Sequence, residues 1–373
     1  MERLDGSSAV PARYRGGIVA LGNFDGFHKG HQAVVGRAVA RARAEERPVL
    51  VATFDPHPVR HFKPDLPPFR LTTLDQRERL FAAAGADAML VFKFNAELAA
   101  VDARDFVTDH LVSRIGAAGV VTGEDFTFGK GRGGNVGVLK LLGQANRLSV
   151  DAVAPVADGE VIVSSSRIRE ALQDGDCETA ARLLTRPFAI QGVVEHGDKR
   201  GRELGYPTAN IPLGHYLRPR FGVYAVRGRL PEGRVLDGVA NLGTRPMFDE
   251  KELLEPHFFD FDGDLYGRTL RVAFLGEQVS HWPATFHAAP DRTIDSLIAV
   301  AYGTSMPAFE ELIPPLLRSY DRLPAAHPLK ARMAEQIWTA LRNAAGRPQI
   351  EGSDAIPVHN WATTAIVYEI REP

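Results

Sequence analysis

The sequence has one cysteine, Cys177, among its 373 residues, so it cannot form an intrachain disulfide. No hydrophobic run is long enough to span a bilayer, and the first residues lack the apolar stretch of a secretion signal. Lys and Arg number 44 against 46 Asp and Glu, so no basic excess indicates nucleic acid or an anionic membrane as a partner. We expect a cytoplasmic protein with neither kind of partner, and interpret Cys177 as structural or incidental.

A Walker-type phosphate loop, GxxxxGK[ST], is also absent. The segment GKGRGG at residues 129–134 fits GxGxxG formally, but it does not join a first strand to a first helix. No acidic residue follows it convincingly at the distance that a dinucleotide site requires. We interpret it as a loop near an active site, and any ATP site must be built from other residues.

Residues 17–163 alternate between apolar runs and amphipathic stretches. The runs are residues 18–21, 49–54, 88–94, 119–122 and 150–156, and the helix-like stretches are 32–46, 73–84, 103–115 and 136–144. This alternation predicts an α/β domain, with a parallel sheet covered by helices on both faces. Ligands of such sheets bind beyond the carboxyl ends of the strands.

The pattern changes after residue 187. Short β-rich runs at 222–228, 235–242, 254–261 and 269–274 are separated by Gly, Pro and Asp, which predicts a small antiparallel barrel or sandwich. Residues 286–373 read as an atypical, mainly helical tail. We therefore predict three regions, 1–186, 187–285 and 286–373.

The clearest local signal is GNFDGFHKGH at residues 22–31, between the first strand and the first helix. A helix N-terminus carries unsatisfied N–H donors and partial positive charge, so it binds phosphate. Gly22, Gly26 and Gly30 would let the backbone approach a ligand. His28 and His31 are three residues apart and share a helix face, where they could stabilise charge on a triphosphate. A zinc site would need a third ligand that no familiar spacing supplies.

A second motif, VSSSRIR at residues 163–169, places hydroxyls at a helix start. Helix capping alone would explain these serines. In a nucleotide site, Arg167 or Arg169 could in addition grip a triphosphate.

Together these motifs resemble the HxGH and SSTxxR signatures of the nucleotidyltransferase superfamily. With FDPHP at 54–58 and GEDFTFG at 123–129, residues 15–275 resemble the prokaryotic bifunctional riboflavin kinase/FMN adenylyltransferase family. The resemblance implies a Rossmann-like adenylyltransferase domain followed by a riboflavin kinase β-barrel, with ATP and Mg²⁺ used in both reactions. It implies contacts of His28 and His31 with the ATP phosphates. The nucleotide-binding residues expected in this domain are Gly22, Phe24, Gly30, Asp125, Ser164, Ser165 and Arg169.

A third segment, GVVEHGDKRG at 192–201 followed by LGYPTAN at 204–210, suits phosphoryl transfer. Gly197, Lys199 and Arg200 would form a flap over phosphates. Thr208 and Asn210 offer oxygens that can share a hard cation bridging ATP phosphates, although a capped turn has the same composition.

The riboflavin hydroxyl needs a base or an orienting acceptor, and the resemblance assigns that role to Glu255 in LEPHFFDF at 254–261. An exposed strand glutamate is the alternative. Pro256 removes a ladder donor, which strands tolerate mainly at edges or bulges. The partners implied are ATP, riboflavin, FMN and FAD. An adenylyltransferase with an impaired barrel, or a non-catalytic flavin-binding protein, remains an alternative.

The tail does not share this resemblance. Segments at 303–307, 313–317, 327–330 and 363–368 faintly resemble a fragment of penicillin-acylase-type enzymes, but no self-cleaving nucleophile accompanies them. We expect the tail to have a packing role or none.

Overall fold

The computed structural model describes residues 1–195, 209–244, 252–259, 261 and 263–276. The chain forms two compact units. The N-terminal unit consists of Met1–Arg169, Leu183–Thr185 and His215–Leu217, and the barrel unit contains the other described residues. The predicted tail, 286–373, and the predicted flap residues Gly197, Lys199 and Arg200, with Thr208, lie outside the described residues. The predicted boundary at 285 also lies outside the described residues. Both predicted region boundaries, at 186 and at 285, stay predictions.

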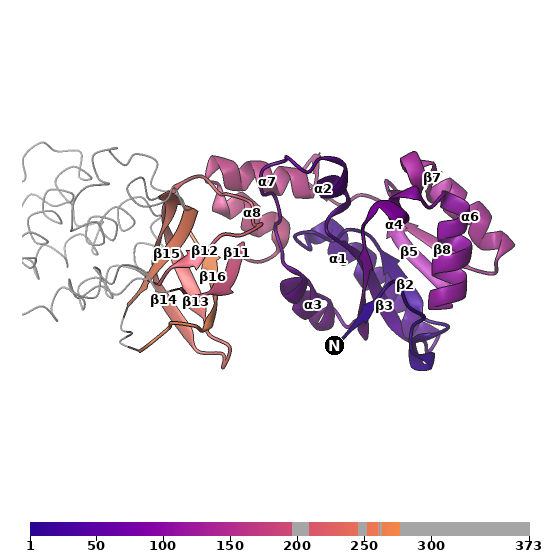
Figure 1. Cartoon of the computed structure of the whole chain (residues 1–373), viewed down its shortest axis with the longest axis horizontal. Coiled ribbons are helices and arrows are strands. Elements are labelled where there is room, and N and C mark those ends of the chain that lie inside the picture. The colour runs from indigo at the N-terminus through magenta and orange to yellow at the C-terminus, as the bar shows by residue number, and fades with distance from the viewer. Residues whose placement is uncertain (196–208, 245–251, 260, 262, 277–373) are drawn as a thin grey trace, which may run out of the picture. The chain divides into compact units, whose positions relative to one another are not determined.

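A six-stranded parallel sheet forms the centre of the N-terminal unit, and Figure 1 shows its strands side by side. The prediction of a parallel α/β domain is confirmed, with one further edge strand. In spatial order the strands are β1 (Glu2–Asp5), β4 (Ala88–Lys93), β3 (Val49–Asp55), β2 (Ile18–Leu21), β5 (Gly119–Gly123) and β8 (Ser149–Val153).

Helices pack on both faces of this sheet because its strands are apolar on both sides. Ile18 and Ala20 of β2 pack in one core with α1 (Lys29–Ala44) and α3 (Leu74–Ala83). Val19 and Leu21 pack in the opposite core with α6 (Val136–Ala145) and with η2 (Phe106–Ile115), a π-helix. The residues of one strand thus alternate between the two cores, as the pleat requires.

Short elements connect these layers. They are η1 (Ala12–Tyr14), α2 (Pro58–Phe62), α4 (Ala96–Ala100), α5 (Ala103–Asp105), β6 (Thr127–Phe128), η3 (Lys130–Arg132), β7 (Gly134–Asn135), β9 (Ala157–Asp158) and β10 (Val161–Ile162). The chain then forms α7 (Ser165–Asp174) and α8 (Cys177–Leu184).

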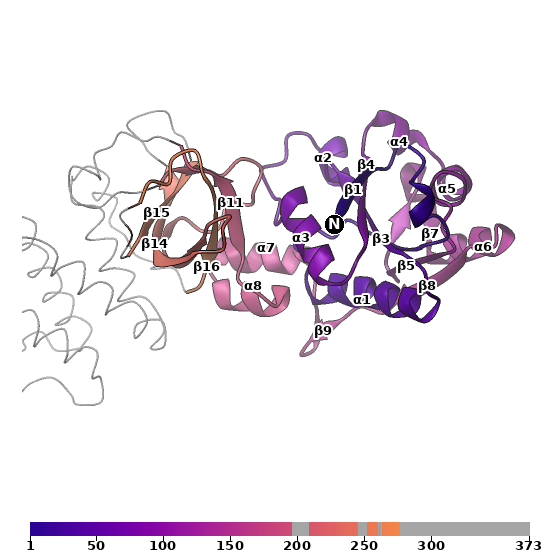
Figure 2. The ribbon, with the colours of Figure 1, turned by 90° about the horizontal axis from the view of Figure 1, so that it is seen from below.

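The barrel unit contains a six-stranded antiparallel sheet that curls into a nearly closed barrel (Figure 2), as predicted. Its two outer strands are joined by a bridge in which Glu195 N–H donates to the Asn210 carbonyl at 2.8 Å. In spatial order the strands are β11 (Ala189–Val193), β16 (Thr269–Phe274), β13 (Gly222–Arg229), β14 (Val235–Thr244), β15 (Glu252–Phe258) and β12 (Ile211–Pro212).

Pro256 lies inside β15, and the ladder shows how the strand tolerates it. The Pro256 carbonyl accepts a 2.9 Å hydrogen bond from Ala209 N–H, next to the two-residue strand β12. The nitrogen and carbonyl of one antiparallel residue point to the same side. The missing donor therefore faces the short strand β12, and the long pairing of β15 with β14 is preserved.

Within the described residues, no helix combines the length and hydrophobicity needed to cross a membrane.

Candidate active sites

The strand order of the N-terminal unit places the GNFDGFH loop at a topological switch point. From β2 the chain proceeds to β3 and β4 on one side, whereas β5 pairs with the other side of β2. Loops that leave the carboxyl ends of two such strands diverge and open a crevice for ligands. The loops concerned are residues 22–28, after β2, and residues 124–126, after β5.

His28 and His31 lie together at the start of α1. Their rings stack with centroids 3.6 Å apart at 22°. His28 is the N-cap of the helix, and its Nδ1 accepts a hydrogen bond from His31 N–H at 3.4 Å. An accepting Nδ1 places the proton of the neutral ring on Nε2. His28 is 6 % exposed and His31 is partly exposed.

The backbone around the pair is strained. Phe24 and Phe27 have φ values of 51° and 45°, which side-chain-bearing residues rarely adopt and which cluster at functional sites. A Cβ at Gly30 would lie 3.2 Å from the His28 ring, and one at Gly22 would lie 3.1 Å from the Phe24 ring. These two glycines therefore make room for rings of the motif itself, rather than only for a ligand as the sequence suggested.

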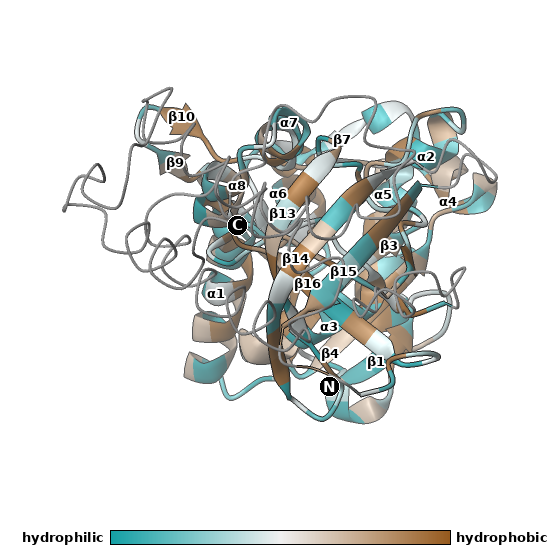
Figure 3. Ribbon diagram, turned by 90° about the vertical axis from the view of Figure 1, so that its left-hand side faces the viewer, coloured by the Kyte–Doolittle hydropathy of each residue, from teal (hydrophilic) through white to brown (hydrophobic). Residues whose placement is uncertain are grey.

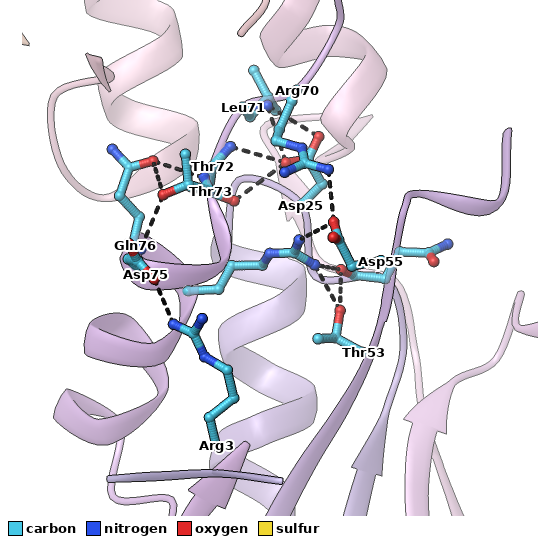
Figure 4. A network of polar contacts seen from close by, with 12 residues as sticks. Arg3, Asp25, Thr53, Asp55, Arg70, Leu71, Thr72, Thr73, Asp75 and Gln76 are labelled. Carbon is cyan, nitrogen blue, oxygen red and sulfur yellow. Dashed lines mark hydrogen bonds and ion pairs between the residues drawn. The ribbon is translucent and has the colours of Figure 1, made fainter. Parts of the chain in front are cut away.

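Asp25, in the middle of the motif, links the loop of residues 22–28 to other segments of the N-terminal unit. Its carboxylate is buried and accepts hydrogen bonds from Leu71 N–H and Thr72 N–H, both at 3.0 Å (Figure 4). The carboxylate also accepts from Thr72 Oγ1 at 3.2 Å and forms an ion pair with Arg169 at 2.9 Å. Burial alone would raise the pKa of Asp25, but Arg169, Arg77 and the Leu71 amide outweigh burial and hold that pKa below its usual range. Asp25 is thus a structural anion.

The serine and arginine of the second motif meet Asp25 as well. Ser165 Oγ donates to the Asp25 carbonyl at 2.9 Å, and Ser164 Oγ accepts from Arg167 N–H at 3.2 Å as a cap of α7. Arg169, which the sequence predicted on a triphosphate, donates to the Asp25 carboxylate and to the Phe69 carbonyl. Its described contacts are therefore with the protein, and a phosphate contact stays a prediction.

A second layer of charge lies behind Asp25. Arg77 is 3 % exposed and donates to Thr53 Oγ1 at 2.7 Å and to the Asn23 carbonyl at 3.1 Å. Arg70 forms a 2.6 Å ion pair with Asp55 (Figure 4). Together with Arg169, three guanidinium groups thus face two carboxylates, those of Asp25 and Asp55. This excess favours an anion at the carboxyl ends of β2 and β3.

His57, in the FDPHP segment, adjoins these charges. Burial lowers the pKa of His57 to about 4; Asp25 raises that pKa, and the neighbouring arginines lower it further. Its Nδ1 accepts from Val59 N–H at 3.2 Å, which caps α2. A neutral His57 adds no charge to the site at neutral pH.

Two more cations lie near the helix starts. Lys29 Nζ is 3.1 Å from Asp158, and Arg167 Nη2 is 3.9 Å from the same carboxylate. Asp158 belongs to the β9–β10 hairpin, in which β10 is hydrophobic (Figure 3). Val161 and Ile162 of β10 are about half exposed. Asp125 is exposed on the loop after β5.

In the barrel, polar residues of β14, of β15 and at the position just before β12 form one row across the sheet. Glu255 of β15 is paired with Asn241 of β14, whose Nδ2 donates to Glu255 Oε2 at 3.2 Å. On the other side, Ile211 pairs with Leu254, which places Asn210 opposite Glu255. Directly opposed residues point to the same side of a sheet. Glu255, the predicted base, is therefore a neighbour of Asn210, a predicted metal ligand. The other predicted ligand, Thr208, lies outside the described residues.

Comparisons with known proteins identify the family. A family model described as FAD synthetase matches residues 10–167, and one described as riboflavin kinase matches residues 184–279. The bifunctional riboflavin kinase/FMN adenylyltransferase of Escherichia coli (strain K12) is 39% identical over 262 residues, 70% of this chain and 84% of the relative. The chain belongs to this family. The Bacillus subtilis (strain 168) member is 37% identical over 263 residues, 68% of this chain and 82% of the relative.

A solved structure shares the fold across both units. The crystal structure titled macrolide-efflux protein, from Streptococcus pneumoniae, is 30% identical, with a TM-score of 0.69. The match covers 82% of this chain and 99% of that one.

The sequence predicts roles for the histidine pair and for Glu255, and these roles stay predictions; it does not predict the charged groups that surround them. Asp25 lies within the motif at residues 22–31 but has no predicted role, and Asn241 and Arg77 lie in none of the motifs described above. One signal was available for Asp25, because a carboxylate within an otherwise apolar, glycine-rich loop requires a partner if the loop is buried.

Proposed function

We propose that the chain phosphorylates riboflavin to FMN in its barrel and adenylylates FMN to FAD in its N-terminal unit, with release of pyrophosphate. The observation that carries the proposal is the stacked His28/His31 pair at the start of α1, at the switch point of a parallel sheet. The family models for the two activities match consecutive parts of the chain, so the single-activity and non-catalytic alternatives are not favoured.

In adenylylation, an oxygen of the FMN phosphate attacks the α-phosphorus of ATP, and the bond to the pyrophosphate oxygen breaks. Negative charge grows on the α-phosphate and on the leaving group. His28 Nε2–H, the His31 ring and the N–H groups at the start of α1 would stabilise this charge. Gly22, Phe24, Gly30, Asp125, Ser164, Ser165 and Arg169 would line the nucleotide site.

In phosphorylation, the riboflavin 5′-hydroxyl oxygen attacks the γ-phosphorus of ATP, the bond from that phosphorus to the bridging oxygen breaks, and ADP leaves. Glu255 would accept the proton of the hydroxyl. Asn241 Nδ2 orients the carboxylate through its hydrogen bond. The flap of Gly197, Lys199 and Arg200 would cover the phosphates.

The cation is proposed to be Mg²⁺, held by Thr208 and Asn210 together with ATP phosphates. Hard oxygen donors suit Mg²⁺. The register of β12 with β15 supports the proposal, because it makes Asn210, the residue before β12, a cross-strand neighbour of Glu255. When bound, the ion would neutralise charge on the phosphates.

We further propose that the catalytic residues for adenylylation lie within residues 1–186 and those for phosphorylation within 187–285. Residues 286–373 would take no part in catalysis, and the protein would act in the cytoplasm. The charge balance and the single cysteine support this compartment.

A product assay tests the proposal. The purified full chain is incubated with ATP, Mg²⁺ and either riboflavin or FMN, and the flavins are separated by chromatography; a sample with EDTA is the control. We expect FMN and then FAD from riboflavin, and FAD from FMN. FAD from FMN without conversion of riboflavin would contradict the kinase half, and no product from either flavin would overturn both halves.

A further inference from the structure

A short segment, His215–Leu217, belongs to the N-terminal unit although its neighbours in sequence belong to the barrel unit. In sequence it lies between β12 and β13, inside the stretch that matches the riboflavin kinase model. Its contacts therefore assign it to a different unit from its sequence position.

The segment adds a strand-like edge to the loop before α3. Arg70 N–H donates to the His215 carbonyl at 3.1 Å, and Leu217 N–H donates to the Arg70 carbonyl at 2.8 Å. These two bonds form a parallel bridge between Arg70 and Tyr216. Backbone pairing of this kind fixes the path of a loop that has no other ladder partner among the described strands.

The Tyr216 side chain holds the far end of the same loop. It is 4 % exposed, and its hydroxyl donates to Gln76 Oε1 at 2.8 Å. Gln76 Oε1 also accepts from Thr73 N–H in the capping box that starts α3. Tyr216 thus fixes residues 70–76 at both ends, once through its backbone bridge and once through its hydroxyl.

Residues 70–76 in turn hold the histidine motif. Leu71 N–H and Thr72 N–H donate to the Asp25 carboxylate, and Thr72 Oγ1 accepts from Gly26 N–H at 2.9 Å (Figure 4). Gly26 is two residues before His28. A continuous series of hydrogen bonds therefore leads from Tyr216 to the loop that presents the imidazoles.

We propose that Tyr216 is a positioning residue for FMN adenylylation, although it lies in the sequence of the kinase module. The inference rests on the proposed function. Charge stabilisation depends on donors placed within a fraction of an ångström, so a loosened Asp25 loop lowers kcat more than it raises KM. Adenylylation should therefore require chain beyond residue 186.

Three full-length variants test this role with FMN and riboflavin as separate substrates. Tyr216→Phe removes the hydroxyl alone, and we expect kcat for FAD formation to fall about fivefold, the usual effect of losing one neutral hydrogen bond. Tyr216→Ala also removes the ring, and kcat should fall about twentyfold, with KM for FMN and the rate of riboflavin phosphorylation within about twofold. Tyr224→Phe is the matched control, because Tyr224 is a buried tyrosine of the barrel whose hydroxyl donates to the Arg220 carbonyl.

Hydrogen exchange gives a readout that does not depend on catalysis. The amides of Leu71 and Thr72 should exchange about tenfold faster in Tyr216→Ala than in the parent chain, and unchanged in Tyr224→Phe. Unchanged FAD formation in both Tyr216 variants, or an equal loss of both activities in Tyr216→Phe, would overturn the role of Tyr216. Absence of FAD formation by the parent chain would instead overturn the proposed function, and with it this inference.

Discussion

The candidate catalytic residues of the N-terminal unit are neighbours in sequence, whereas those of the barrel come from two strands and from the residue before a third. His28 and His31 are three residues apart at one helix start. Glu255, Asn241 and Asn210 are brought together only by strand register. The groups that support the histidine loop are distant in sequence. Its residue Asp25 is bonded to Leu71 and Arg169, which lie 46 and 144 residues further along the chain.

This comparison indicates what each site tolerates. A cross-strand row is held by the ladder itself, so a conservative change of one side chain leaves the others in place. A loop with strained φ values depends on its buried carboxylate, so a change at Asp25 should disturb the whole motif.

The largest effect should come from Glu255→Gln, which keeps the shape of the side chain but removes the base. We expect riboflavin phosphorylation to fall about 10²- to 10⁴-fold while adenylylation of added FMN stays within about twofold. Glu252→Gln, on the same strand and ion-paired with Arg218, is the control. A kinase rate within tenfold of the parent would show that Glu255 is not the base.

The next effect concerns stability of the N-terminal unit. Asp25→Asn removes the anion that balances Arg169 and Arg77, and breaking a buried pair in this way costs about 3 kcal/mol. We expect denaturant unfolding of the unit to shift by that amount and FAD formation to fall. Asp75→Asn, which breaks an exposed pair with Arg3, should cost no more than about 0.5 kcal/mol. Equal shifts in the two variants would contradict the account of Asp25.

A smaller effect depends on pH. The pKa of His57 is about 4 in the folded chain against an ordinary 6.5, so the unfolded chain binds more protons between these values. Stability then rises with pH in this window and is lost as pH falls from 6.5 to 4, by about 2 kcal/mol. His57→Asn keeps a capping side chain for α2 and should flatten this slope.

The control for that experiment is His61→Gln in the same short helix, which should keep the slope of the parent. If His57→Asn and the parent lose equal stability between pH 6.5 and 4, the buried neutral imidazole is not the cause.

The smallest effect should follow Ser164→Ala, which removes the cap of α7. A lost N-cap costs about 1 kcal/mol of stability. Ser166→Ala, at an exposed position two residues later, should be neutral. Thermal unfolding and KM for ATP are measured for both variants. Loss of a cap would lower the stability of Ser164→Ala relative to the parent chain, whereas loss of a nucleotide contact alone would raise its KM for ATP and leave its stability unchanged.

The sequence predicted most of the fold because five of the six strands of the parallel sheet lie in mainly apolar runs and the helices between them are amphipathic. It missed β1, whose residues Glu2–Asp5 are mostly polar because the strand lies at a sheet edge. It also missed β12, which has only two residues, one of them Pro212. Neither segment has a periodic signal.

The sequence could predict the candidate site residues where they lie close together in the sequence. The histidine pair follows from spacing alone, but the ion pair of Asp25 with Arg169 joins segments that only the folded chain brings together. The assignment of His215–Leu217 to the N-terminal unit has no sequence signal at all, because backbone pairing leaves no pattern in three residues.

The most direct test of the central claim is FAD formation by His28→Ala from added FMN, measured beside riboflavin phosphorylation by the same preparation. We predict that FAD formation falls about 10²- to 10³-fold, the usual effect of losing one donor to a developing oxyanion, while FMN formation from riboflavin is retained. FAD formation close to that of the parent chain would contradict the account.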